Sequence, residues 1–267
     1  MLFIFLMRYA FRVGYVGEGF HGLARQPGLR TVEGDILQAL NDRQYREGED
    51  FFLFSSRTDM GVGAASNVFA AELKREPRLG EINSSLDGVW VWAYAPVSHS
   101  FNPIRDARLR WYRYVFPHRF SVEQEDVMRG AAQLLVGRHD FSSFAIVEDK
   151  NPVRTVKRIE IFNTGYTVMD IYAPGFLRQM VRRIANALMR VASGEWDLDE
   201  IRRRLSERDP VPPAPPEGLI LMDVHFPNIL WNVDSDWYGR MMDYWEDLEK
   251  RSMVRASLAR ARLFFQP

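Results

Sequence analysis

Between two apolar runs lies the polar segment Ser55-Ser56-Arg57-Thr58-Asp59-Met60-Gly61-Val62-Gly63. The run before it is Phe51-Phe52-Leu53-Phe54, and the run after it is Asn67-Val68-Phe69-Ala70-Ala71. Short apolar runs bounded by turn residues are typical of buried strands, and glycines let the backbone turn tightly or approach a ligand closely. The segment therefore predicts a polar loop between two strands. A guanidinium beside a carboxylate favours the ionised carboxylate, so Arg57 and Asp59 indicate either a functional site or a salt bridge that closes the turn.

The residues around this loop predict the rest of an N-terminal half. Residues 9–15 alternate as in a strand, and Thr31 is suited to cap a helix that runs to about Arg43. Further strands are expected near 51–54, 67–72 and 89–97. The aromatic residues of the last strand alternate by two, which favours packing in the core or on a sheet face: Trp90, Trp92 and Tyr94.

The second half repeats the theme of strand, helix and strand. The expected elements are a strand at 109–116, a helix that starts with a capping box at Ser121 and ends before Gly137, a hairpin around 163–165, a helix from about 176 to 193, and a strand at 219–226. A proline-rich connector over 210–216 precedes the last strand. Residues 235–263 are expected to form a helix that packs on the body or joins two copies.

Two similar halves predict an α+β fold in which two subdomains share an antiparallel sheet. Pro103 and its polar neighbours mark the link between the halves. The expected division is residues 1–104 for the N-terminal subdomain with the polar loop, 105–227 for the C-terminal subdomain, and 228–267 for a helical extension.

The composition is that of an ordinary globular chain, with 267 residues, 46% of them hydrophobic and 26% charged. Without cysteine there is neither a disulfide framework nor a thiolate metal site, and the five histidines have no recognised metal spacing. The apolar start at 1–7 lacks the basic leader of a signal peptide and is too short to span a bilayer. We expect a buried or edge strand or an extension there, no membrane segment, and a cytoplasmic location.

Positive charge is concentrated although the formal net charge is zero. Residues 101–119 carry five arginines against one acid, and residues 171–194 carry four arginines and no acid. Residues 234–249 carry acidic side chains that compensate for much of this positive charge. Arginine binds phosphates with two parallel hydrogen bonds and stacks on bases, so this distribution favours nucleic-acid binding over surface salt bridges.

Four motifs, in order along the chain, resemble those of the TruA family of tRNA pseudouridine synthases. The resemblance covers roughly residues 9–227. The matching segments are the loop Arg57-Thr58-Asp59-Met60-Gly61-Val62, the strand Arg110-Trp111-Tyr112-Arg113-Tyr114-Val115, the helix Phe176-Leu177-Arg178-Gln179-Met180-Val181-Arg182-Arg183-Ile184, and the strand Glu217-Gly218-Leu219-Ile220-Leu221.

The resemblance implies the pseudouridine synthase fold, in which two ferredoxin-like subdomains share a mainly antiparallel sheet flanked by helices. It implies isomerisation of uridine in the tRNA anticodon stem-loop by a homodimer, without cofactor or metal. Asp59 would be the catalytic carboxylate, Tyr112 would stack on the uracil and help to move the C5 proton, and Arg182 would pair with Asp59. The residues expected to contact RNA or line the pocket are Arg25, Arg57, Arg110, Arg178, Leu219 and Leu221, with Arg57 filling the gap left by a flipped uridine.

Three other interpretations compete with this one. A non-catalytic RNA-binding relative would not need the trio Asp59, Tyr112 and Arg182. A small-substrate glycosidase or hydrolase usually needs a second carboxylate, and none lies near Asp59 in sequence. The run 17–22 has the pattern G-x-G-x-x-G of a dinucleotide site, but that site needs a helix to begin there, and the helix signal begins only at Thr31.

Overall fold

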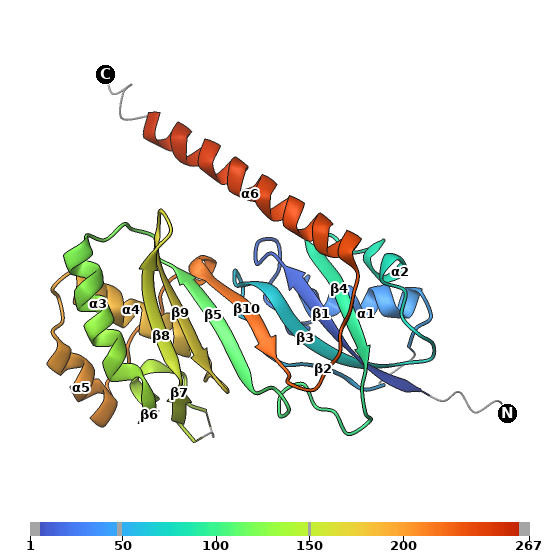
Figure 1. Ribbon diagram of the computed structural model, residues 1–267, viewed down its shortest axis with the longest axis horizontal. Coiled ribbons are helices and arrows are strands. Elements are labelled where there is room, and N and C mark those ends of the chain that lie inside the picture. The colour runs from blue at the N-terminus through green and yellow to red at the C-terminus, as the bar shows by residue number, and fades with distance from the viewer. Residues whose placement is uncertain (1–5, 47–49, 149–150, 262–267) are drawn as a thin grey trace.

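The computed structural model describes residues 6–46, 50–148 and 151–261 (Figure 1). Most of the apolar start therefore lies outside the described residues, and the first strand begins at Met7.

The described strands form one nine-stranded sheet and a separate two-stranded sheet. The order along the large sheet is β11-β4-β1-β3-β10-β5-β9-β8, and β2 pairs with β3. Its pairings are antiparallel except that of β10 with β3. The strands are β1 (Met7–Tyr15), β2 (Phe52–Phe54), β3 (Gly63–Leu73), β4 (Val89–Pro96), β5 (Leu109–Val115), β8 (Arg158–Asn163), β9 (Thr167–Ala173), β10 (Leu219–His225) and β11 (Asn232–Val233), with β6 (Gly137–Asp140) and β7 (Val153–Val156) in the small sheet.

The helices form two groups, one for each half of the sheet (Figure 1). In the first half they are α1 (Val32–Asp42) and α2 (Leu79–Asn83); in the second they are α3 (Val122–Leu135), α4 (Met180–Ala192) and α5 (Leu198–Ser206). The expected α+β fold with a shared, mainly antiparallel sheet is confirmed. The division at residues 104 and 105 stays a prediction, because the sheet runs without interruption across both halves.

Local chemistry explains where the helices begin. The side chain of Thr31 accepts a hydrogen bond from the Gly34 amide at 3.2 Å and so caps α1, as expected. Ser121 and Gln124 form the predicted capping box of α3. The helix α5, capped by Asp197, was not predicted. It is short and rich in arginine, and within it only Ile201 is buried, so its sequence has almost no apolar period.

The helix expected from Phe176 begins four residues later, at Met180. Gln179 has a left-handed backbone with a φ of 62°, which a helix cannot include. Before it, Arg178 pairs with Ile146 in an isolated β-bridge. The prediction of the helix start was wrong because an apolar period does not reveal a bridge to a distant segment.

The aromatic residues of β4 do not share one face. Trp90 lies 4.8 Å from the ring of Tyr244 and Trp92 lies 5.3 Å from that of Tyr238. Tyr94 instead lies 6.1 Å from the ring of Tyr9, a residue of β1. The pairing of β1 with β4 contains a register shift, which redirects the alternation within β4. Packing in the core or on a sheet face is therefore correct, but it involves both faces.

The expected C-terminal helix is α6 (Ser235–Ala261). It packs on β4 through the ring contacts of Tyr238 and Tyr244, and its Met241 is buried next to Gly14 of β1. Its far end projects away from the sheet (Figure 1). Within residues 6–46, 50–148 and 151–261, no helix combines the length and apolar character that crossing a bilayer requires.

Candidate active site

Asp59 lies on the loop between β2 and β3. Hydrogen bonds among buried polar groups hold this loop in place. The hydroxyls of Tyr15 and Thr58 are 2.9 Å apart and hydrogen-bonded. The Asn67 amide donates to the Ser56 carbonyl oxygen at 2.8 Å and to the Tyr15 hydroxyl at 3.1 Å. All four of these neighbours of Asp59 are buried, so the loop conformation is fixed by the core and not by solvent.

The glycine-rich run 17–22 forms a wall against the same loop. A Cβ at Gly17 would lie 2.3 Å from the carbonyl of Gly61, and one at Gly22 would lie 3.2 Å from the Met60 amide. The Leu23 amide donates to the Thr58 carbonyl at 3.1 Å. Between residue 6 and α1 at Val32 no helix begins, so this run is not a dinucleotide site. Its glycines let two backbones approach closely.

Asp59 is paired with Arg182, which lies far away in sequence at the start of α4. The Arg182 Nη1 donates to Asp59 Oδ2 at 2.8 Å, and the side chains are 12% and 34% exposed respectively. The Arg182 Nε donates to the Ala214 carbonyl oxygen at 2.7 Å. One guanidinium therefore links the loop of Asp59, α4 and the proline-rich connector, and it leaves part of the carboxylate exposed.

The turn salt bridge between Arg57 and Asp59 is absent. Arg57 is exposed, and in the part of the chain that the structure describes its guanidinium has neither a hydrogen bond nor an ion pair. The partner of Asp59 is Arg182. Arg57 is thus a free cation two residues from the carboxylate.

Tyr112 lies on β5, opposite Leu221 of β10. Its ring is buried and meets the edge of the Phe176 ring at 5.2 Å and 86°. Burial raises the pKa of the Tyr112 phenol, and the charge of Asp59 adds to this rise, while a hydrogen bond with Ser56 and the charge of Arg110 oppose it.

Leu219 and Leu221, expected to line the pocket, are buried beside the tyrosines of β5. Leu219 pairs with Tyr114 and Leu221 pairs with Tyr112. A glycine follows Glu217 because a Cβ at Gly218 would lie 2.6 Å from the Val115 carbonyl oxygen. The strand β10 can therefore lie close against β5 and bring its leucines to Tyr112.

Arg110 was expected to contact RNA, but its side chain is buried and hydrogen-bonded to other groups of the protein. It is only 6% exposed, and its guanidinium donates to the Ser56 hydroxyl, to Ser55 and to the carbonyl oxygen of Pro174. The alternation of β5 turns Arg110 inward with Tyr112, which the arginine count of the segment did not reveal.

Arg25 and Arg178, the other cations expected to contact RNA, are exposed. The Arg178 side chain is 61% exposed and pairs with Glu148 at 3.0 Å. Arg25 uses its backbone amide to bind Glu33 at 2.7 Å. Both side chains remain accessible to a phosphate.

The sequence did not single out Tyr15, Ser56 and Asn67 as supports of the site. Asn67 carries a signal in retrospect, because it is a fully buried amide at the start of an otherwise apolar run and a buried amide needs partners. The other two gave no signal beyond their place near a strand end.

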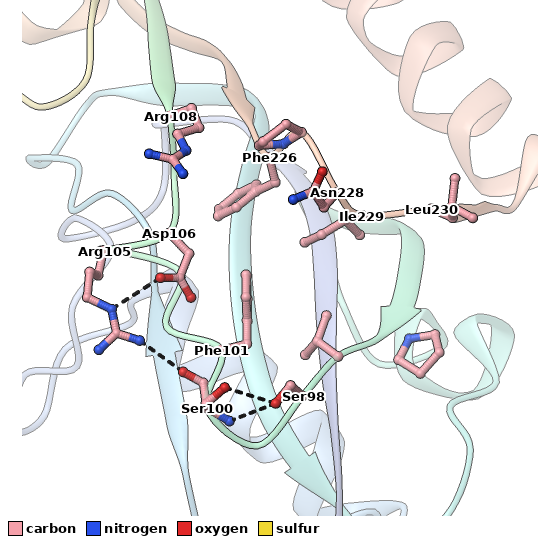
Figure 2. Close-up of a pocket in the computed structure, with 13 residues that line it drawn as sticks. Ser98, Ser100, Phe101, Arg105, Asp106, Arg108, Phe226, Asn228, Ile229 and Leu230 are labelled. Carbon is pink, nitrogen blue, oxygen red and sulfur yellow. Dashed lines mark hydrogen bonds and ion pairs between the residues drawn. The ribbon is translucent and has the colours of Figure 1, made fainter.

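A surface pocket of about 780 Å³ lies elsewhere, between the segment after β4 and the segment after β10 (Figure 2). Figure 2 shows Phe101, Phe226 and the pair Arg105–Asp106 among its lining residues. It includes none of Asp59, Tyr112 and Arg182. Over the described residues there is also no group of three or more His, Asp or Glu that is arranged to hold a metal ion.

Comparison with known proteins places this geometry in a family. A family model for tRNA pseudouridine synthase matches residues 131–227. A tRNA pseudouridine synthase A from Pyrococcus abyssi (strain GE5 / Orsay) is 40% identical over 230 residues, which cover 84% of this chain and 86% of that protein. The protein of the same name from Thermococcus kodakarensis is 38% identical over 262 residues, 94% of this chain and 97% of that protein.

A third relative, a tRNA pseudouridine synthase A from Methanococcoides burtonii, is 39% identical over 83% of both chains. Among solved structures, a chain of the crystal structure of a Cbf5-Nop10-Gar1 complex aligns with a TM-score of 0.36 at 12% identity, over 66% of this chain and less than half, 44%, of that chain. Because curated relatives share more than a third of their residues with it along most of its length, the chain belongs to the tRNA pseudouridine synthase family.

Proposed function

We propose that this protein converts uridines of the tRNA anticodon stem-loop to pseudouridine, with Asp59, Tyr112 and Arg182 as its catalytic residues. The observation that carries the proposal is the ion pair between Arg182 and a partly exposed Asp59, next to the buried phenol of Tyr112. A non-catalytic RNA-binding protein has no need for a partly exposed carboxylate that is held in this way by a largely buried guanidinium.

The reaction breaks the C1′–N1 bond of uridine, turns the base and joins C1′ to C5. C5 then loses its proton and N1 takes up a proton from solvent. The product therefore has the same composition as the substrate. Ribose becomes electron-poor at C1′ during the cleavage, and a fixed carboxylate stabilises such a centre. Arg182 keeps Asp59 oriented at 2.8 Å, and Tyr112 stacks on the base and helps to move the C5 proton.

Arg57 is proposed to occupy the space that the flipped uridine leaves in the RNA. Its guanidinium is exposed, and none of the described residues engages it. It lies on the same loop as Asp59 and can reach into the stack while the base enters the site. Unstacking a nucleotide costs a few kcal/mol, and a side chain in the gap offsets part of that cost.

Tritium release tests the activity. The protein is incubated with tRNA that carries tritium at uracil C5, without an added cofactor, and tritium is expected to appear in water while the mass of the modified nucleoside is unchanged apart from the label. Binding of tRNA without any tritium release across a panel of tRNAs would support the non-catalytic alternative instead.

We also propose that the protein acts as a homodimer in the cytoplasm. Exposed apolar side chains between residues 230 and 244 support the dimer: Leu230, Val233, Tyr238, Met242 and Tyr244. Light scattering coupled to gel filtration checks this proposal. A mass near the 31.1 kDa of one chain at micromolar concentration would contradict it.

A further inference from the structure

Arg110 is a buried cation without a carboxylate partner. Its Nε donates to the Ser56 hydroxyl at 3.0 Å. Its Nη2 donates to the carbonyl oxygens of Ser55 at 3.1 Å and Ile104 at 3.0 Å, and its Nη1 donates to that of Pro174. Each acceptor is electrically neutral. Across the described ranges, no acidic side chain forms an ion pair with Arg110.

Such an arrangement is costly for a protein that needs only a structural link. Removing a charge from water costs several kcal/mol even after relaxation, and buried charges are usually paired with an opposite charge. Burial accordingly lowers the pKa of the Arg110 guanidinium. A neutral side chain would fill the same space without this cost, so the retained charge calls for a role of its own.

The position of Arg110 indicates that role. It precedes Tyr112 by two residues on β5, and both are buried on the same side of the strand. Its guanidinium holds Ser55 and Ser56, the first residues of the loop that carries Asp59. The Ser56 hydroxyl that accepts from Arg110 also opposes, by hydrogen bonding, the rise in the pKa of Tyr112, so Arg110 and Tyr112 share Ser56 as a neighbour.

We propose that Arg110 is a positioning residue of the isomerisation: its fixed positive charge acts through Ser56 on Tyr112 and keeps the catalytic loop in place, and it does not bind RNA. This inference rests on the proposed roles of Asp59 and Tyr112. A cation fixed in a site with little water favours the negative charge that the base and Tyr112 gather while the C5 proton moves.

Two substitutions separate the charge from the hydrogen-bonding fork. Arg110→Lys keeps the charge and loses the fork, whereas Arg110→Gln loses the charge and keeps an amide donor. The exposed Arg178 is the matched control, because it is expected to touch phosphate. For each variant, kcat, KM, the tRNA Kd at several salt concentrations and the melting temperature are measured.

Arg110→Gln is expected to lower kcat by roughly 100-fold, the scale of removing one fixed electrostatic group, with KM, Kd and the salt slope unchanged. Arg110→Lys is expected to keep at least about tenfold more turnover than Arg110→Gln. Arg178→Gln is instead expected to weaken tRNA binding, with a salt slope that is shallower by about 0.7 for one single-strand phosphate contact.

Three results would overturn the proposal: a wild-type kcat for a folded Arg110→Gln, equal kcat losses for Arg110→Lys and Arg110→Gln, or a weaker Kd with a shallower salt slope for either. If Arg110→Gln does not fold, Ser56→Ala carries the test. It removes only the intermediate hydroxyl and should lower kcat by about tenfold at unchanged Kd; a wild-type kcat would overturn the proposal equally.

Failure of the Arg110 proposal can be distinguished from failure of the proposed function. Tritium release by the wild type, together with its loss in Asp59→Asn, establishes the isomerisation before any Arg110 variant is measured. Unchanged kcat in the Arg110 variants then concerns Arg110 alone, whereas absence of release by the wild type concerns the function.

Discussion

At the scale of single residues, Asp59 and Arg57 lie two positions apart on one loop and differ in burial and in their partners. Asp59 is partly buried and held by Arg182, while Arg57 is exposed and without a partner among the described residues. The sequence alone allowed them to neutralise each other. Their separation is what the proposed division of roles requires, with Asp59 acting on the sugar and Arg57 on the RNA stack.

Asp59→Asn is expected to abolish turnover, because it keeps the size of the side chain and removes its charge. The affinity for tRNA should stay within about tenfold of the wild type, or ~1.4 kcal/mol. Tritium release and a binding titration on the same preparation measure both quantities. Turnover at a tenth of the wild-type rate would exclude Asp59 as the catalytic carboxylate.

Arg57→Ala is expected to slow the step that exposes the uridine. The deficit should therefore shrink on an RNA whose target uridine is unpaired, since flipping costs less there. Single-turnover rates on a paired and an unpaired substrate measure the difference, and Asp59→Asn serves as the control because its chemical defect gains nothing from an unpaired base. Equal rate losses on the two RNAs would rule out insertion of Arg57 into the stack.

At the scale of elements, the glycine-rich run 17–22 packs directly against the loop that carries Asp59. Gly17→Ala would place a methyl group 2.3 Å from the Gly61 carbonyl, so one of the two backbones must move. The expected result is a loss of roughly 1–3 kcal/mol of stability and a lower kcat, measured by denaturant unfolding and tritium release.

The control for this change is Gly130→Ala in α3. Its nearest neighbour would be the Leu198 side chain at 4.0 Å, and an alanine inside a helix is favoured by up to about 1 kcal/mol over a glycine. Gly130→Ala should leave kcat unchanged and raise stability. A Gly17→Ala variant as stable and active as this control would show that the close approach does not constrain the loop.

The elements that the sequence predicted correctly are those with local causes. Thr31 and Ser121 cap their helices through neighbouring residues, and Gly165, with a φ of 93°, forms the expected turn between β8 and β9. The errors have distant causes. The bridge of Arg178 to Ile146 delays α4, and the register shift in β4 depends on its pairing with β1.

The same distinction applies to the site. The motif positions of Asp59, Tyr112 and Arg182 were available from the resemblance, and the structure brings the first and last together. The inward orientation of Arg110 was not available, because a count of arginines says nothing about which side of a strand they occupy.

At the scale of the whole molecule, buried tyrosines make the protein sensitive to alkali. Burial raises the pKa of Tyr15 and Tyr112, and it raises that of Tyr114 to about 12. In the unfolded chain these phenols ionise near 10, so above that pH the unfolded state binds fewer protons than the folded state. The contribution of these tyrosines to the free energy of unfolding is therefore expected to be constant below about pH 9, and the free energy of unfolding is expected to fall as the pH rises from 10 to 12.

Denaturant unfolding at a series of pH values checks this expectation. A variant with an exposed tyrosine replaced, Tyr166→Phe, is the control, because Tyr166 is 48% exposed and its loss should leave the alkaline slope intact. A free energy of unfolding that does not change up to pH 12 would contradict the assignment of these tyrosines to the core.

The central place of β10 has a consequence for how the protein is made. This strand lies between β3 and β5, yet it leaves the ribosome after every other strand except β11 and after α1 to α5. Until it emerges, the nascent chain already contains Asp59, Tyr112 and Arg182 but holds two half-sheets that no strand connects. Synthesis therefore joins the two half-sheets only near its end, and a product that terminates before Leu219 contains Asp59, Tyr112 and Arg182 without the strand that connects the two halves.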